Sequence, residues 1–168
     1  RAFHYISNTS TAYEALKKYD QAEAWRRKWL AFVKDRSGVE SSLYGDALAG
    51  LGMNLLQQKK WSDAESTLQQ CLAIREKKQP DAWRTFNTQS MLGGVQLGQK
   101  KYSAAEQNLL KGFEGMKQRE STMAARERSF LVDALDRLIQ LYTETSKPDD
   151  VKKWQAEKDK FTQPGKTK

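Results

Sequence analysis

The sequence has few of the side chains from which catalytic and metal-binding sites are usually built. Its 168 residues include one cysteine, Cys71, and one histidine, His4. One cysteine cannot form an internal disulfide, and a zinc site needs about three or four clustered ligands that this sequence does not supply. A Cys/His catalytic pair is poorly supported as well, because nucleophile and base require a third, orienting group. We therefore expect no enzymatic activity, no metal and no cofactor, and we interpret Cys71 as a small core residue.

Long apolar runs are also missing. No stretch approaches the roughly 18 apolar residues that cross a bilayer, and the amino end lacks the basic-then-apolar order of a signal peptide. We therefore expect a soluble chain. It begins with Arg1 rather than methionine, so we expect it to be a piece of a longer protein. A cytoplasmic location is favoured because a lone cysteine suits a reducing compartment, but the sequence leaves the compartment open.

Proline is scarce, and charge of one sign is in excess. The chain has 3 prolines, with 38% hydrophobic and 30% charged residues. This balance predicts a folded, helix-rich protein. The formal net charge of +8 could attract nucleic acid, an anionic membrane or an acidic protein surface. Charge alone does not indicate the fold.

Glycine-rich ligand-binding motifs are absent. Gly165-Lys166-Thr167 resembles the end of a phosphate-binding loop, but Lys160 stands where that loop needs its first glycine, and no strand precedes it. Gly93 and Gly94 do not fit the spacing of a dinucleotide-binding loop. We interpret them as points of close packing between helices.

What the sequence does contain is a repeated phrase. It occurs at residues 17–23, 59–65 and 100–106, and each copy has two lysines, an aromatic residue and a final Ala-Glu. The aromatic residues lie 42 and 41 positions apart. Each phrase is typical of a helix start, since a side chain that can cap the helix is followed three residues later by glutamate. The predicted caps are Asp20, Ser62 and Ser103.

Apolar residues at helical spacing precede and follow each phrase, which predicts a unit of helix, short turn and helix. The helices expected from the spacing and the stop signals run near residues 3–17, 21–36, 43–57, 63–78, 83–98, 104–120, 127–144 and 149–161. We expect one repeat domain at 1–162 and a disordered tail at 163–168. Its repeats should lie at about 3–42, 43–83, 84–127 and 128–162.

These positions resemble the tetratricopeptide repeat, in which a large residue, Leu-Gly and a second large residue precede a helix that begins with alanine. In the second repeat the matching residues are Leu48, Leu51, Gly52, Leu55, Ala64 and Leu68. The length of 41 or 42 residues, with a step of 46 from Leu92 to Leu138, is similar to the long repeats of kinesin light chains. The resemblance implies an all-α fold, a right-handed superhelix (α-solenoid) of about four helical hairpins.

A second resemblance is to the repeat arrays that follow the kinase domain in some large bacterial serine/threonine kinases. These arrays share phrases such as residues 57–61 and 92–94. No kinase motif is present in this chain. The resemblance implies a regulatory or docking arm of a bacterial protein.

The tetratricopeptide resemblance implies a non-catalytic protein- or peptide-binding scaffold, a module of a larger protein that uses a concave groove of first helices. The family's groove positions, counted from Phe3, Gly45, Phe86 and Val132, hold no Lys or Arg and five acidic residues. Asn8 and Arg137 stand at a neighbouring position. The residues expected to bind the peptide are Asn8, Asp46, Met53, Leu56, Asn87, Leu97, Asp133, Asp136, Arg137 and Gln140. We expect an extended or helical peptide with basic or polar side chains toward Asp133 and Asp136.

Two other functions remain open. The first is nonspecific binding of nucleic acid or an acidic surface by basic convex helices, with Trp25 and Trp29 as a candidate contact surface near Arg26, Arg27 and Lys28. The second is a structural spacer that self-associates into a homo-oligomer. Neither predicts specific recognition of nucleic acid or contact with a membrane.

Overall fold

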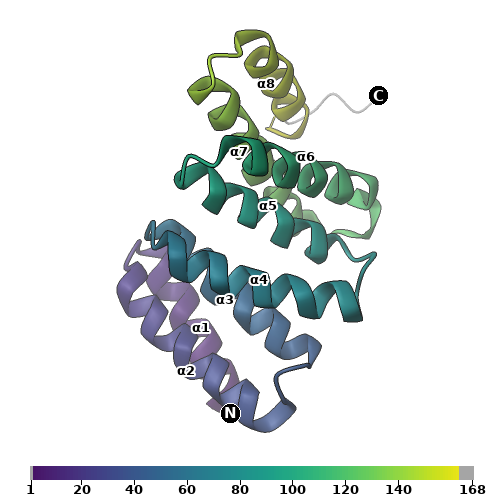
Figure 1. Ribbon diagram of the computed structural model, residues 1–168. Coiled ribbons are helices and arrows are strands. Elements are labelled where there is room, and N and C mark those ends of the chain that lie inside the picture. The colour runs from purple at the N-terminus through teal and green to yellow at the C-terminus, as the bar shows by residue number, and fades with distance from the viewer. Residues whose placement is uncertain (1, 163–168) are drawn as a thin grey trace. The chain divides into compact units, whose positions relative to one another are not determined.

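The computed structural model describes residues 2–162, with side chains from residue 8 onward (Figure 1). Arg1 and the predicted tail at 163–168 lie outside the described residues. The helices are α1 (Ala2–Ala15), α2 (Tyr19–Ser37), α3 (Ser42–Gln57), α4 (Trp61–Lys78), α5 (Trp83–Gly98), α6 (Tyr102–Gln118), α7 (Ser129–Glu144) and α8 (Pro148–Thr162). Two 3₁₀ turns, η1 (Glu120–Thr122) and η2 (Ala125–Arg128), precede α7. The described residues contain no strand, so the predicted all-α class is confirmed, and each expected helix is found within two residues of its predicted ends.

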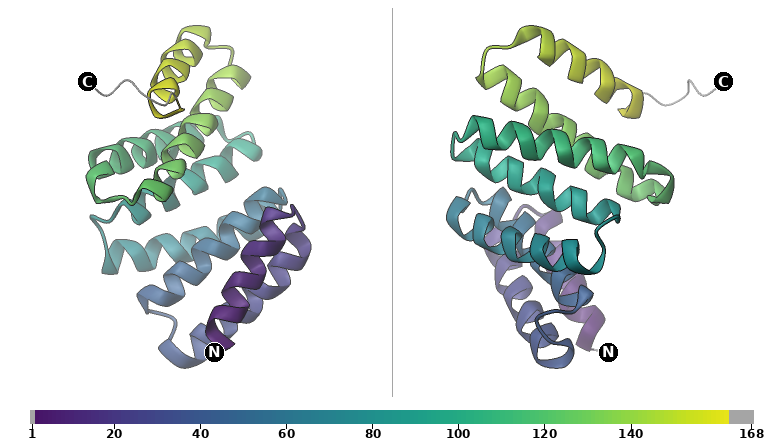
Figure 2. Two further views of the ribbon diagram at one scale, coloured as in Figure 1. Left: turned by 180° about the vertical axis from the view of Figure 1, so that it is seen from behind. Right: turned by 45° about the vertical axis from the view of Figure 1, so that its right-hand side comes forward.

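The chain divides into two compact units, residues 1–81 and 82–168, which we call the N-terminal and C-terminal units and describe separately. In the N-terminal unit the hairpins α1–α2 and α3–α4 are joined by packing of α2 against α3. In the C-terminal unit the hairpins α5–α6 and α7–α8 are joined by packing of α7 against both α5 and α6 (Figure 2). The four predicted hairpins are therefore present. A single domain over 1–162 and a superhelix through all four hairpins stay predictions.

The repeated phrase forms the turn inside the first three hairpins. Lys17, Lys59 and Lys100 have positive φ angles of 56°, 58° and 61°. At the second turn the Lys60 amide donates to the carbonyl of Leu55, and the Lys59 amide donates to that of Leu56. These two bonds define a Schellman motif, in which a left-handed residue closes the end of a helix. The same pair of bonds closes α1, α5 and α7.

The predicted caps at Asp20, Ser62 and Ser103 are wrong. The following helices begin two residues earlier than expected, at Tyr19, Trp61 and Tyr102, and none of them has a side-chain cap bond within the described chain. A capping oxygen must come from the residue before the first helical one, and lysine occupies that position in all three turns. The turn is held by backbone bonds instead.

Small residues allow the paired helices to approach closely. A Cβ on Gly52 would lie 2.5 Å from Cδ2 of Leu68, and one on Gly93 would lie 2.7 Å from Cγ of Leu109. The two pairs are the same contact one repeat apart, so the interpretation of Gly93 as a packing residue is confirmed. Cys71 is fully buried, with its Sγ 3.2 Å from the carbonyl of Gly45, which confirms that it is a core residue.

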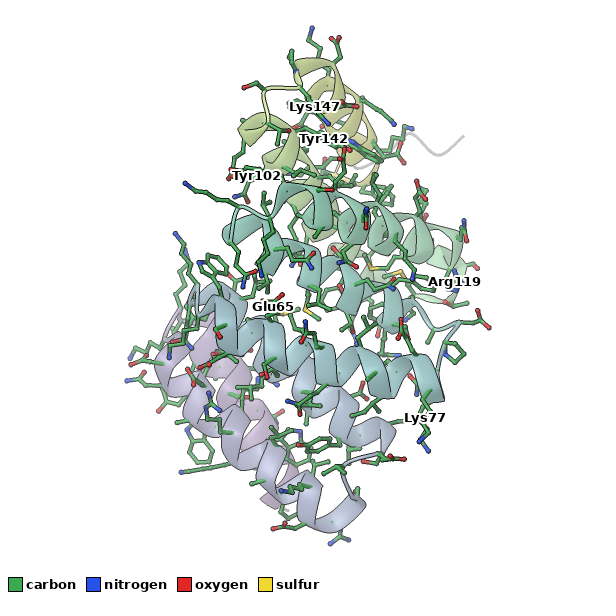
Figure 3. All side chains as sticks on the ribbon, in the orientation of Figure 1. Glu65, Lys77, Tyr102, Arg119, Tyr142 and Lys147 are labelled. Carbon is green, nitrogen blue, oxygen red and sulfur yellow. The ribbon has the colours of Figure 1, made fainter. Side chains whose placement is uncertain are left out.

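The last helix covers the core of the C-terminal unit. Trp154 of α8 is buried and meets Phe113 edge-on, with the ring centroids 5.4 Å apart, while Val151 and Phe161 pack beside it. Across the α7–α8 turn, the ammonium of Lys147 lies 5.4 Å from the ring centroid of Tyr142 (Figure 3). Burial and the nearby Glu106 carboxylate raise the pKa of the Tyr142 hydroxyl, so it stays protonated.

Candidate functional site

In the N-terminal unit, three predicted site residues lie on one side of α3, a surface we call the α3 face. Asp46, Met53 and Leu56 follow the helical spacing of seven and three residues. Met53 and Leu56 are half-buried, and Asp46 is exposed. The remaining predicted residue of this unit, Asn8, is exposed on α1. The side chains of residues 1–7, including His4, lie outside the described residues.

The negative charge of the α3 face is already paired. Oδ1 of Asp46 accepts a hydrogen bond of 2.7 Å from Nη2 of Arg75 on α4, and the Arg75 side chain is only 7% exposed. A partner would therefore meet Asp46 as one half of an ion pair. The half-exposed apolar surface of Met53 and Leu56 is the part of this face that can still gain from burial.

A polar network joins α1, α2 and α3 in the same unit. The Glu14 carboxylate accepts two bonds from Arg26, of 3.1 and 2.7 Å, and a third of 3.3 Å from Asn54. The Gln58 amide donates to Asn54 and, at 2.8 Å, to Glu23. Partial burial would raise the pKa of Glu23, but hydrogen bonds from Lys60, Arg27 and Gln58 outweigh it and lower the pKa to about 2. This network orients the helix that carries the α3 face.

In the C-terminal unit, the predicted site residues lie on α5 and α7, which pack together. Nη1 of Arg137 donates to the buried Ser90 hydroxyl over 3.1 Å, linking the two helices. Asn87 lies one turn before Ser90 and is 5% exposed, and its Oδ1 has no hydrogen-bond partner among the described residues. Asp133 lies one turn before Arg137. The structure therefore brings Asn87, Arg137 and Asp133 onto adjacent turns of neighbouring helices.

The acidic and polar side chains of α7 are exposed, and we call Asp133, Asp136 and Gln140 the α7 face. Asp136 pairs with Lys158 of α8, and Gln140 donates to Glu144 over 2.8 Å. Desolvation raises the pKa of Asp133, with Arg137 opposing the rise and Asp136 adding to it. Asp133 is the acidic residue of this face with the least direct ion pairing.

Two sequence-based assignments need correction. Leu97 is 2% exposed and belongs to the apolar core that α5 to α8 share, so it is not a surface anchor. In the count of repeat positions, Leu97 is equivalent to the half-buried Leu56. Leu97 is nevertheless buried, because α7 packs against α5 in the C-terminal unit. Trp29 is also buried, stacked on Phe32 at 5.7 Å, whereas Trp25 is half-buried beneath the Lys28 ammonium. Trp25 and Trp29 therefore form no joint contact surface.

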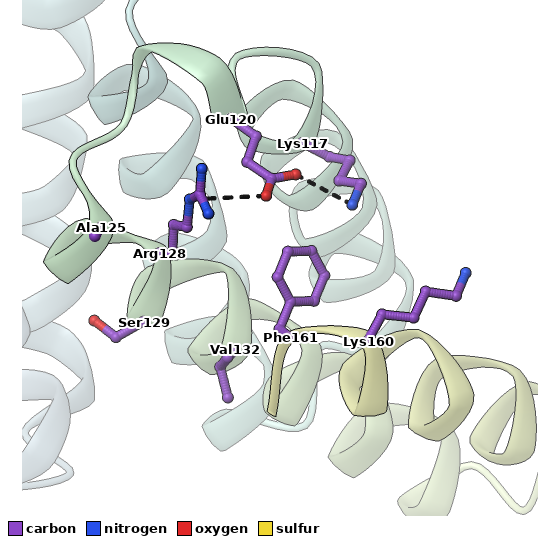
Figure 4. A pocket seen from close by; sticks show the side chains of 8 residues that line it. All are labelled: Lys117, Glu120, Ala125, Arg128, Ser129, Val132, Lys160 and Phe161. Carbon is purple, nitrogen blue, oxygen red and sulfur yellow. Dashed lines mark ion pairs between the residues drawn. The ribbon is translucent and has the colours of Figure 1, made fainter. Parts of the chain in front are cut away.

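The sequence analysis missed a pocket in the C-terminal unit. This cavity of about 500 Å³ lies between the end of α6, the connection to α7 and the end of α8 (Figure 4). Its lining residues are Lys117, Glu120, Ala125, Arg128, Ser129, Val132, Lys160 and Phe161. The signal was the longer step of 46 residues between the third and fourth repeats, which by itself indicates only a variation in length.

The described residues contain no group of three or more His, Cys, Asp or Glu side chains that could hold a metal ion. Among the helices described above, none is both long and apolar enough to cross a membrane.

Comparison with known proteins fits this geometry. The tetratricopeptide repeat family model matches residues 6–77, which lie in the N-terminal unit. Residues 6–77 therefore contain repeats of the tetratricopeptide type. No curated protein matches the sequence. Tetratricopeptide repeats are generally protein-interaction scaffolds and are typically non-catalytic.

Solved structures extend the likeness of the array to both units. BtubC (BKLC) from P. vanneervenii is 14% identical with a TM-score of 0.75, and the match covers 99% of this chain and 67% of that one. A putative kinesin light chain with nearly identical TPR-like repeats from Podosopora anserina is 12% identical, with a TM-score of 0.74 and coverages of 99% and 79%. A second crystal structure of those Podosopora anserina repeats is 11% identical, with a TM-score of 0.72 and coverages of 94% and 73%. The predicted likeness to kinesin-light-chain repeats is confirmed at the level of fold.

Proposed function

We propose that this array is a non-catalytic scaffold module of a larger protein and binds a protein or peptide partner through its first helices. The observation that carries the proposal is the α3 face. The other sides of α3 pack against α2 and α4, while Met53 and Leu56 stay partly exposed on a helix whose orientation is held by a polar network. Apolar side chains on a preorganised helix can bury a partner's anchors at little cost in conformational entropy.

The chemistry of the partner is proposed from the α7 face. Asp133 can attract a basic side chain, because Asp136 and Gln140 already have partners within the unit. Asn87 does not contribute to this face, because the residue is only 5% exposed and its Oδ1 is buried. A peptide with apolar anchors and basic or polar side chains fits these groups. We expect a modest affinity, about micromolar, because such a peptide loses conformational entropy when it binds.

Nonspecific nucleic-acid binding is less well supported. Stacking platforms need an exposed aromatic face, but Trp29 belongs to the core and Lys28 covers the ring of Trp25. If phosphate contacts nevertheless dominated, binding to a random duplex would weaken steeply as salt is raised. Tight duplex binding at physiological salt would reverse this ranking. Self-association stays a prediction.

The decisive experiment identifies a partner and then maps its site. A partner captured with the full-length parent would be purified and titrated against the array by calorimetry. Met53→Asp should weaken binding by about tenfold or more, because it puts a charge into a buried apolar contact. Leu16→Asp is the matched control, since Leu16 is 66% exposed at the end of α1 and lies outside the α3 face. If both variants bind like the original chain, the partner does not use α3.

The α7 face is tested separately with Asp133→Lys. A partner with basic side chains should bind this variant several-fold more weakly, and the loss should shrink at high salt. A partner that binds Asp133→Lys more tightly would instead be acidic and would contradict the proposed chemistry of this face.

A further inference from the structure

The connection between α6 and α7 differs from the equivalent connections in the rest of the array. It spans residues 119–128, ten residues, whereas those before α3 and α5 span 38–41 and 79–82, four residues each. The additional residues form η1 and η2. Arg119 at their start lies over the ring of Phe86, with its guanidinium carbon 4.3 Å from the centroid. Glu127 in η2 accepts bonds from Arg84 and from the Ala124 amide, both of 2.9 Å. The insertion is therefore fixed at both ends.

This ordered insertion forms one wall of the pocket, which we call the insertion pocket. Glu120 and Arg128 come from the insertion, Lys117 from α6, and Lys160 and Phe161 from α8 (Figure 4). Val132 and Ala125 supply apolar surface beside the half-buried Phe161 ring. The cavity of about 500 Å³ is large enough for one or two side chains, and its walls combine cationic and apolar groups.

The cations in the pocket wall are more exposed than the carboxylates with which they pair. Glu120 pairs with Lys117 at 3.2 Å and with Arg128 at 3.8 Å, and Glu157 pairs with Lys160 and, at 3.7 Å, with Lys117. The side chains of the two carboxylates are 28% and 19% exposed, whereas those of the three cations are 40% to 68% exposed. Three cations therefore share two less exposed carboxylates, which leaves one net positive charge at this surface. An incoming anion gains from that charge.

We propose that the insertion pocket binds an acidic peptide segment, with an apolar side chain seated against Phe161 and Val132 and flanking carboxylates held by Arg128, Lys160 and Lys117. This site shares no residue with the α3 and α7 faces and prefers the opposite charge. It goes beyond the proposed function, because the array would then hold a second segment of different chemistry.

A peptide fits these walls better than a nucleic acid does. The Lys117 ammonium lies 4.3 Å from the Phe161 ring centroid and covers the face on which a base would stack. Free phosphate has no apolar part to bury against Val132 and Phe161. Glu120 in the pocket wall also repels a dianion more than it repels a single carboxylate. A short acidic segment with one apolar residue can contact both the cationic and the apolar residues of the pocket wall.

The test uses the whole 168-residue chain and a labelled probe, a short peptide with one leucine between pairs of glutamates, followed by fluorescence anisotropy. The probe should bind, and Arg128→Glu combined with Lys160→Glu should weaken binding by about tenfold or more. Arg128→Glu alone guards against misfolding, because Arg128 is half exposed and its pairing distance to Glu120 is long. Arg128→Lys, which retains the charge, should keep most of the binding.

The matched control is Lys111→Glu, the same charge reversal at an exposed site on α6, six residues from Lys117. It should change probe binding less than about twofold, since it lies away from the pocket and acts only through screened charge. If it weakens binding as much as Arg128→Glu does, the attraction is general and the proposal fails. A probe with glycine in place of leucine should bind several-fold more weakly, and equal binding would exclude the apolar subsite.

Three further results would overturn the proposal. These are no binding of the glutamate probe at millimolar concentration, tighter binding of a probe with lysines in place of glutamates, and tighter binding of a single-stranded oligonucleotide. Met53→Asp should leave probe binding unchanged. A loss in that variant would place the probe on the α3 face, so failure of this site can be told apart from failure of the proposed function.

Discussion

Phe86 and Gly115 face each other across α5 and α6, at the place where Gly45 and Ile74 face each other across α3 and α4. A Cβ on Gly115 would lie 2.0 Å from Cδ1 of Phe86, and a Cβ on Gly45 would lie 3.3 Å from Cγ2 of Ile74. Phe86 follows Gly45 by 41 positions and Gly115 follows Ile74 by 41 positions, so the two pairs occupy equivalent places one repeat apart. The large side chain comes from the second helix in one repeat and from the first helix in the next.

This exchange predicts strong coupling between Phe86 and Gly115. Gly115→Ala should destabilise the C-terminal unit by about 1–3 kcal/mol, because the added methyl overlaps a ring in a packed interface. Phe86→Ala should also destabilise by leaving a cavity. In the double variant the new methyl has space, so the loss should be smaller than the sum by about 1 kcal/mol or more. Urea denaturation of all four proteins measures the coupling, and strict additivity would refute the proposed exchange.

The left-handed lysines predict a stabilising substitution. Lys59 has a φ of 58°, a conformation that costs an L-residue roughly 1–2 kcal/mol and costs glycine much less. Lys59→Gly should therefore stabilise the N-terminal unit by about 0.5–1 kcal/mol, after the larger entropy of glycine in the unfolded chain is allowed for. Lys111→Gly, the same replacement inside α6, should cost about 1 kcal/mol. If Lys59→Gly is less stable than the original chain, the lysine side chain stabilises the folded state by more than the strain of its left-handed backbone destabilises it.

Helix existence was predictable because repeated apolar spacing and repeated phrases report on local structure directly. The helix caps could not be predicted in this way. Ser62 and Glu65 match the sequence of a capping box, but that match does not show where the preceding turn ends and the helix begins. Nothing in the lysine pairs indicated positive φ, for which glycine is usual. The burial of Leu97 and the exchange between Phe86 and Gly115 depend on which neighbouring helix fills a space, and counting repeat positions carries no such information. The insertion pocket needs residues from three segments, so the long repeat alone could not reveal it.

The serine pair Ser62 and Ser41 separates a cap suggested by sequence from one present in the structure. Ser62 is exposed at the second position of α4, whereas the Ser41 hydroxyl accepts a bond of 3.1 Å from the Tyr44 amide at the start of α3. Ser41→Ala should cost about 1 kcal/mol. Ser62→Ala should change stability by less than about 0.5 kcal/mol. Chemical denaturation checks both, and the opposite order would mean that α4 begins two residues later, at Asp63, with Ser62 as its cap.

The stability of the N-terminal unit should depend on pH through Glu23. Its carboxylate accepts bonds from Arg27, Gln58 and Lys60, and its pKa falls from 4.5 to about 2 in the folded chain. A group whose folded pKa is depressed stabilises the protein above its unfolded pKa. This contribution should therefore be complete above about pH 5 and should disappear as the pH falls from about 4.5 toward 2.

Glu23→Gln isolates this contribution. Because Arg27 and Lys60 are about half exposed, solvent screens the interaction, and we expect a loss of about 1–2 kcal/mol at neutral pH rather than the full value implied by the pKa. The loss should shrink to below about 0.5 kcal/mol at pH 2, where Glu23 is about half protonated in the folded chain and almost fully protonated in the unfolded chain. Glu40→Gln is the control, since Glu40 pairs with Lys77 on the open surface and its removal should change the acid dependence little. Urea midpoints measured from pH 2 to pH 7 give the comparison. A Glu23→Gln curve parallel to that of the original chain would mean that Glu23 has an ordinary pKa and that the network contributes nothing specific through its charge.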